Sequence, residues 1–115
     1  MKRGILAIAS VVAFVLAVAL AAAPVAGADA PDGKAVFTAQ KCSLCHSVES
    51  QKIERTVKSS KAKDLSNVGA ERDAAWIEKW LKKEEMLDGK PHQKTFTGTP
   101  EEMQALVHWL GTLKK

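Results

Sequence analysis

The sequence feature that most constrains this chain is a short motif that contains both of its cysteines, Cys42 and Cys45, followed at once by His46. Thiols three positions apart lie on one side of a helical turn, so they can reach two vinyl groups along one edge of a porphyrin. The imidazole of the next residue can then bind the iron. The Cys-x-x-Cys-His pattern is therefore typical of covalent haem attachment. We predict one haem c, with thioethers at Cys42 and Cys45 and with His46 as the proximal iron ligand.

Three other interpretations of the cysteines fit the sequence less well. A structural zinc site needs four ligands, and His92 and His108 are much further apart than the about three to five positions that separate the histidines of a zinc finger. A dithiol oxidoreductase needs a strand before its two cysteines, and no alternating strand pattern precedes Cys42. A disulfide that closes so small a loop would stabilise the fold little. The motif therefore favours haem.

The N-terminal segment has the order of a secretory signal peptide. Lys2 and Arg3 are followed by an apolar run from Ile5 to Ala23, broken only by Ser10, and then by the small residues 26–28. A positive start, an apolar stretch and a small-residue cleavage site are the three parts of such a signal.

We predict cleavage after Ala28, because cleavage after Ala30 would leave Pro31 at the scissile bond. Residues 1–28 are then the signal peptide, residues 29–115 form the domain, and the expected location is the bacterial periplasm. The apolar run is also just long enough to span a bilayer. An uncleaved membrane anchor is therefore the alternative.

Charge and length exclude other classes of protein. The formal net charge is +4, and the signal segment supplies two of the basic residues, so the domain carries only about +2. This excess is small and its basic residues are not interleaved with stacking aromatics, so we expect no nucleic-acid binding. So short a chain forms one domain with a small core, to which a covalent haem would add apolar volume and cross-links.

The domain is predicted to be all-α, with three main helices joined by loops around the haem. Apolar spacing and Pro31 at the first turn predict a helix over about 31–41. Apolar residues at three- and four-residue spacing predict a second helix over about 70–86. The third begins at Thr99 as cap, with a proline at the first helical position and a Glu three residues after the cap.

These features resemble a small class I c-type cytochrome, and the resemblance covers nearly all of residues 29–115. Residues 33–37 are similar to the first helix of that family, and residues 106–110 are similar to the last. The resemblance implies that Gly33 lets the two helix backbones approach closely. It also implies that Phe37 crosses Trp109 in the core away from the haem.

The segment 64–69 resembles the part of the family that runs past the histidine side of the haem. The family usually has a proline just before this segment, and here that position is Lys63. A backbone carbonyl at this position can still accept a hydrogen bond from the proximal imidazole. The change should therefore affect rigidity more than function.

The sixth iron ligand is the least constrained part of the prediction. The family normally takes a Met from the loop before the last helix; residues 96–99 resemble that loop, but Lys94 occupies the usual Met position. His92, in the middle of the loop, is our first choice, and Met86 is the alternative. Lys94, water or an open position are further possibilities. A thioether would raise the reduction potential, whereas a second imidazole would lower it.

Met103 and His108 also carry possible iron ligands, but both belong to the predicted last helix. Met103 fits the apolar stripe of that helix, as an isolated core Met commonly does. His108 lies at the helix edge between core positions. We therefore expect structural positions for both.

The predicted function is one-electron transfer by an exported, monomeric haem protein with redox partner proteins in the periplasm or on the inner membrane. No catalytic constellation is present and the domain is too small for a substrate pocket beside a haem, so we expect no enzyme activity. The alternatives are a gas-binding or sensor module with an open sixth position, and a peroxidase-like subunit. The basic stretch 51–63 is either a solvated loop or a docking patch for an acidic partner.

Overall fold

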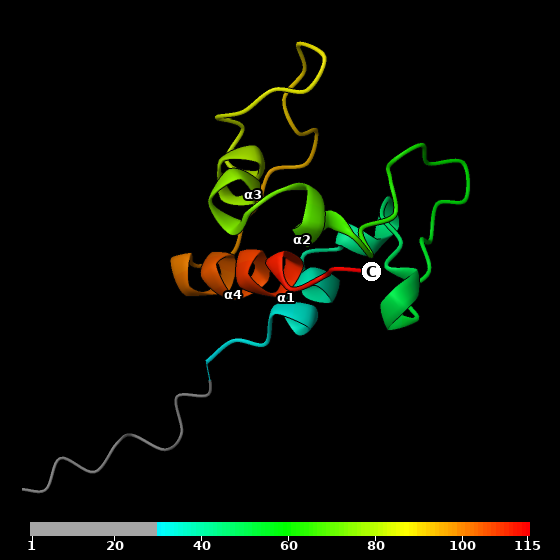
Figure 1. The fold of residues 1–115 in the computed structure, drawn as a ribbon, viewed down its shortest axis with the longest axis horizontal. Helices are drawn as coiled ribbons and strands as arrows, with labels where there is room; N and C mark the ends of the chain where they lie inside the picture. The colour runs from blue at the N-terminus through cyan, green and yellow to red at the C-terminus, as the bar shows by residue number, and fades with distance from the viewer. Residues whose placement is uncertain (1–29) are drawn as a thin grey trace, which may run out of the picture.

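The computed structural model describes residues 30–115, and within them the chain is mainly helical (Figure 1). The described residues contain no β-strand, only two isolated bridges between Val48 and Ile53 and between Leu87 and Lys90. This confirms the helical fold class. The elements, in chain order, are α1 (Gly33–Ala39), η1 (Cys42–Leu44), η2 (Glu49–Gln51), α2 (Val68–Glu71), α3 (Ala74–Leu81) and α4 (Pro100–Gly111).

The first and last helices begin at side-chain caps. Thr99 caps α4, because its hydroxyl accepts a hydrogen bond from the Glu102 N–H at 3.1 Å, as its sequence predicts. In α1 the carboxylate of Asp32 accepts from the Lys34 N–H at 2.9 Å, so Asp32 is the cap and not the first turn. The predicted helix over 31–41 is thus too long at both ends.

The predicted continuous helix over 70–86 is wrong. It is two helices, because Asp73 takes an extended conformation and its carboxylate accepts a hydrogen bond from the Trp76 N–H at 2.7 Å. An N-terminal cap at this position starts a new helix and so separates α3 from α2. The apolar periodicity continues across the break, and for this reason it did not reveal the cap.

Helix α3 also ends earlier than predicted, at Leu81. Lys83 has a left-handed conformation with φ of 62°, and the Glu84 N–H donates to the Lys79 carbonyl at 2.8 Å while the Lys83 N–H donates to Trp80 at 3.1 Å. This pair of bonds is a Schellman motif formed without a glycine. Residues 82–99 are therefore a long loop between α3 and α4, seen in Figure 1 as the yellow to orange segment.

Helices α1 and α4 cross at very close range through Gly33. A Cβ atom at this position would lie 2.3 Å from the Ala105 carbonyl oxygen and 2.4 Å from the Trp109 Cβ, so only glycine fits. Phe37 follows one turn later and packs against Trp109 with ring centroids 5.4 Å apart and planes at 57°. Both predicted features of this crossing are confirmed.

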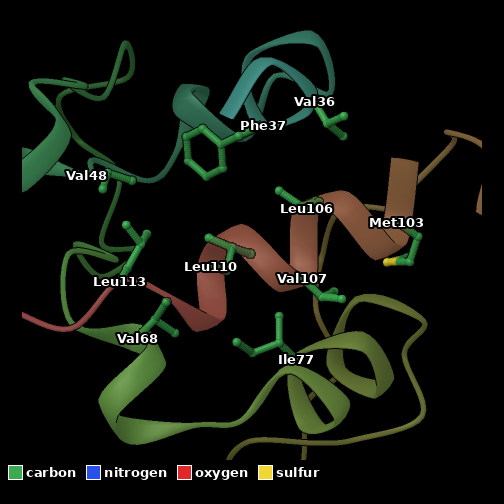
Figure 2. Packing of buried hydrophobic residues seen from close by; sticks show 10 residues of the cluster. All are labelled: Val36, Phe37, Val48, Val68, Ile77, Met103, Leu106, Val107, Leu110 and Leu113. Atoms are coloured by element: carbon green, nitrogen blue, oxygen red, sulfur yellow. The ribbon is translucent and has the colours of Figure 1, made fainter. Parts of the chain in front are cut away.

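The core lies along α4, which α1 and α3 cover from two sides (Figure 2). In that view Ile77 of α3 points toward Val107 of α4, and Val68 of α2 lies beside Leu113. The buried apolar residues are Val36, Phe37, Val48, Val68, Ile77, Met103, Leu106, Val107, Leu110 and Leu113.

The predictions for residues 1–28, including the signal peptide, its cleavage site and the possible anchor, lie outside the described residues. Between residues 30 and 115, no helix is both long and apolar enough to cross a bilayer.

Candidate functional site

The two cysteines and His46 lie on one tight turn that follows α1. Lys41 has a left-handed conformation, with φ of 59°, which directs the chain out of α1 and into η1. The Cys45 and His46 N–H groups both donate to the Cys42 carbonyl, at 3.2 and 3.0 Å. Cys42 is half-buried and Cys45 is exposed. The local fold thus brings the two sulfur atoms and the imidazole to one region.

The loop over residues 82–99 lies close to this turn. Burial raises the pKa of the Cys42 thiol, and the nearby positive charge of Lys94 partly offsets that effect. A second link runs from the end of α1, where the side-chain oxygen of Gln40 accepts hydrogen bonds from the N–H and hydroxyl of Thr97, both at 3.2 Å. The loop expected to supply the sixth ligand therefore lies against the cysteine motif.

The ring of His46 is fixed by the carbonyl of Lys63, whose oxygen is 2.8 Å from the imidazole Nδ1. A carbonyl oxygen can only accept, so Nδ1 carries the proton and Nε2 keeps its lone pair. Burial lowers the pKa of His46, the bond to Lys63 opposes this, and nearby His92 and Arg55 lower the pKa further. The hydrogen bond predicted at Lys63 is present, and the neutral ring is suited to bind a metal ion through Nε2.

Asp64 holds the segment that contains this carbonyl. Its carboxylate accepts from the Ser47 hydroxyl at 2.7 Å and from the N–H groups of Glu49 and Ser66, both at 2.9 Å. Burial would raise the pKa of Asp64, but these hydrogen bonds hold it well below its usual range. Asp64 lies in the family-like segment 64–69, but no sequence pattern there indicates this role.

Arg55 supports the residues just before Lys63 through hydrogen bonds to backbone. Its guanidinium donates to the carbonyls of Ser60 at 2.6 Å and Ala62 at 3.0 Å. The basic stretch 51–63 is predicted to be a solvated loop or a docking patch, and at Arg55 the side chain is half-buried and binds the backbone of this stretch. Arginine can bind several carbonyls at once because its planar guanidinium carries five N–H donors. The sequence carries no pattern that separates this arginine from the neighbouring lysines.

A second imidazole lies opposite His46. The rings of His46 and His92 have centroids 6.3 Å apart and planes within 11° of parallel. The Nδ1 of His92 is 2.9 Å from the Lys94 carbonyl oxygen, so this nitrogen also carries the proton. Both rings are therefore bound to backbone through Nδ1 and keep Nε2 for a ligand.

The separation of the two rings fits a metal ion bound between them. Metal–nitrogen bonds of about 2.0 Å, with about 1.15 Å from each ring centre to its nitrogen, place opposed imidazoles about 6.3 Å apart. Among residues 30–115, no group of three or more His, Cys, Asp and Glu side chains is placed to hold a metal ion, so the protein offers this ion two imidazoles and no larger ligand set. The arrangement suits an iron whose other ligands come from a porphyrin attached beside it.

The remaining candidates lie in less suitable places. Met86, on the loop after α3, is 60% exposed. Met103 is buried in the core, and His108 is exposed on α4, as the sequence suggests for each. Lys94 is exposed, and its carbonyl binds the ring of His92.

An aromatic stack on α3 reaches the ring of His92. Trp80 meets that ring edge-on at 5.4 Å and 67°, and Trp76 stacks on Trp80 at 5.7 Å and 15°. The guanidinium of Arg72 lies over Trp76, 4.3 Å from the ring centre. Both tryptophans lie within the segment 70–86 that the sequence predicts to be helical. Their four-residue spacing indicates a shared helix face, but not that this face meets the loop.

Comparison with protein families identifies the scaffold. The family model of cytochrome c matches residues 30–114. This chain belongs to the cytochrome c family. No curated protein and no solved structure matches it significantly. Membership implies haem-based electron transfer and a covalently bound haem c with iron, and Cys42 and Cys45 fit the attachment motif of such a cytochrome.

Proposed function

We propose that this cytochrome is a periplasmic, monohaem class I electron carrier in which His46 and His92 are the two axial ligands of the iron. Cys42 and Cys45 would form the thioethers. The observation that carries the proposal is the pair of near-parallel imidazoles, 6.3 Å apart and each bound to backbone through Nδ1.

The side chains around the site have separate tasks in this proposal. The bound haem supplies one-electron chemistry at the iron. The Lys63 carbonyl orients the ring of His46 and makes its Nε2 a stronger donor, and the Lys94 carbonyl does the same for His92. Two imidazole ligands favour a lower reduction potential than a thioether would give. With both axial positions occupied by protein, the site suits electron transfer and leaves no position for a substrate or a gas.

The decisive experiment compares His92→Ala with Met86→Leu in the purified holoprotein. We expect His92→Ala to turn the ferric iron high-spin and the ferrous iron open to carbon monoxide, whereas Met86→Leu should keep the wild-type absorption spectrum. The control is His108→Ala, which removes an exposed imidazole on α4. A near-infrared thioether charge-transfer band in the wild type, lost in Met86→Leu, would transfer the role to Met86.

The same preparations test the alternative of a gas sensor. Rapid, tight binding of carbon monoxide by the reduced wild type at neutral pH would contradict a carrier with two protein ligands and would favour the sensor. We expect slow binding, limited by dissociation of His92.

The proposed location and partners rest on the sequence. The mass of the exported protein should place Asp29 at its N-terminus, and an intact chain in the membrane fraction would instead establish an anchor. Lys52, Lys58 and Lys61 are exposed on the basic loop, which supports docking of an acidic redox partner. Exchange of these lysines for Gln should slow electron exchange with such a partner, most strongly at low salt.

A further inference from the structure

The two axial imidazoles are held in different ways. The acceptor for His46 is Lys63, 17 positions away, in a segment fixed by Asp64 and Arg55. The acceptor for His92 is Lys94, only two positions away in the same loop. A ring and an acceptor in one short segment can rotate together without breaking their bond. The hydrogen bond of His92 therefore cannot by itself set the angle of its ring relative to His46.

The loop that carries His92 has few other attachments near this residue. The Lys83 ammonium donates to the Gln93 carbonyl at 3.3 Å, and the isolated bridge between Leu87 and Lys90 closes a turn within the loop. Neither contact bears on the imidazole itself. The contact that does is the edge-on packing of Trp80, at 5.4 Å and 67°.

The indole of Trp80 is held in place by its own helix and by its neighbours. Trp80 lies on α3, whose Ile77 is only 3% exposed and packs into the core against α4. Trp76 stacks on its indole, and Arg72 covers Trp76. Aromatic rings pack favourably edge to face, so the indole of Trp80 favours one orientation of the His92 imidazole relative to its own plane.

We propose that Trp80 is a positioning residue that holds the imidazole of His92 near-parallel to that of His46. The inference rests on the proposed axial role of His92 and extends it. The angle between the planes of two axial imidazoles determines the g anisotropy of low-spin ferric haem in electron paramagnetic resonance. Parallel planes give a rhombic spectrum. As the planes turn toward the perpendicular, the largest g value increases and its signal moves to lower field. The Trp80 side chain also slows dissociation of His92 from the iron.

The test uses the holoproteins Trp80→Leu and Trp80→Phe, with Trp109→Leu and Trp109→Phe as matched controls. Trp109 packs against Phe37 at the crossing of α1 and α4, so its loss perturbs the core without removing a contact to His92. We expect a rhombic wild-type spectrum, a shift of the largest g value to lower field in Trp80→Leu, and a smaller shift in Trp80→Phe. Carbon monoxide should bind ferrous Trp80→Leu several-fold faster than wild type, and both Trp109 variants should retain the wild-type spectrum.

The outcomes separate the two proposals. A wild-type spectrum in Trp80→Leu, with an unchanged rate of carbon monoxide binding, would overturn the positioning role while leaving two histidine ligands in place. Equal shifts in the Trp80 and Trp109 variants would overturn it too, because they would indicate general loosening of the fold. A thioether band in the wild type would instead refute His92 as ligand. If Trp80→Leu yields no holoprotein, the comparison of Trp80→Phe with Trp109→Phe decides.

Discussion

The substitution Gly33→Ala tests whether the close crossing of α1 and α4 holds this fold together. The added Cβ would lie 2.3 Å from the Ala105 carbonyl oxygen and 2.4 Å from the Trp109 Cβ, whereas ordinary contact begins at 3.4 Å. Both neighbours are backbone or the first side-chain atom, so neither can rotate away. The two helices must therefore move apart by about 1 Å, a gap that forfeits a quarter to a half of the dispersion energy of the separated atoms.

The size of the effect follows from two opposing contributions. Overpacking of a well-packed core costs about 1–3 kcal/mol, and here the upper end applies because Phe37, 1% exposed, lies within the same crossing. Alanine is about 1 kcal/mol better than glycine inside a helix, and this is the upper bound of the gain at Gly33, the first residue of α1. We expect a net loss of about 2 kcal/mol in the free energy of unfolding. With a guanidinium slope of about 3 kcal/mol per M, the unfolding midpoint should fall by about 0.7 M.

The assay is guanidinium unfolding of the ferric holoprotein, followed by far-UV circular dichroism. Lys34→Ala is the matched control, since its exposed side chain lies next to Gly33 on the same helix and should move the midpoint little. An unchanged midpoint in Gly33→Ala would refute this prediction, because α1 and α4 would then accept an added Cβ atom without loss of stability.

Two further predictions concern the segment that positions His46. Asp64→Asn should lower the free energy of unfolding at pH 7, and its difference from wild type should narrow as the pH falls below about 4, because a carboxylate with a depressed folded pKa stabilises the fold only while it is ionised. Guanidinium unfolding midpoints of the two proteins at pH 7 and pH 3 measure this difference. An equal difference at the two pH values would contradict the prediction. Arg55→Ala should lower the free energy of unfolding by about 1.5–3 kcal/mol, because the carbonyls of Ser60 and Ala62 lose their donor. Arg55→Lys should not restore the lost stability, and thermal unfolding of both variants measures this. Full rescue by lysine would show that charge alone suffices.

The sequence predicts those features that depend on local residue type. The Cys-x-x-Cys-His turn and the Thr99 cap each follow from residues at fixed spacing, and both are present. The contact of Phe37 with Trp109 follows from the family resemblance and is also present. Spacing failed at Asp73, because a capping carboxylate interrupts a helix without changing the apolar period. It failed again at Lys83, where a non-glycine residue takes the left-handed conformation that ends α3.

The candidate site could be predicted only in part, because its components come from segments far apart in the chain. His92 was the first choice for the sixth ligand from its position in a loop, but its parallel placement against His46 depends on how residues 82–99 fold over the cysteine turn. The contact with Trp80 depends on the packing of α3 against α4. Side-chain periodicity within one helix contains no information on either.

Both imidazoles bind main-chain carbonyls, those of Lys63 and Lys94, and this choice of acceptor affects how the sequence can vary. A carbonyl oxygen is present whatever side chain a position carries, so mutation at residue 63 or 94 cannot delete the acceptor. The two acceptors are thus supplied by the path of the backbone, and the side chains at these positions are free to vary or to serve another purpose, as Lys63 does in its ion pair with Glu71. Loss of either acceptor through evolution would require a change in the path or length of the backbone and could not come from one exchanged side chain at residue 63 or 94.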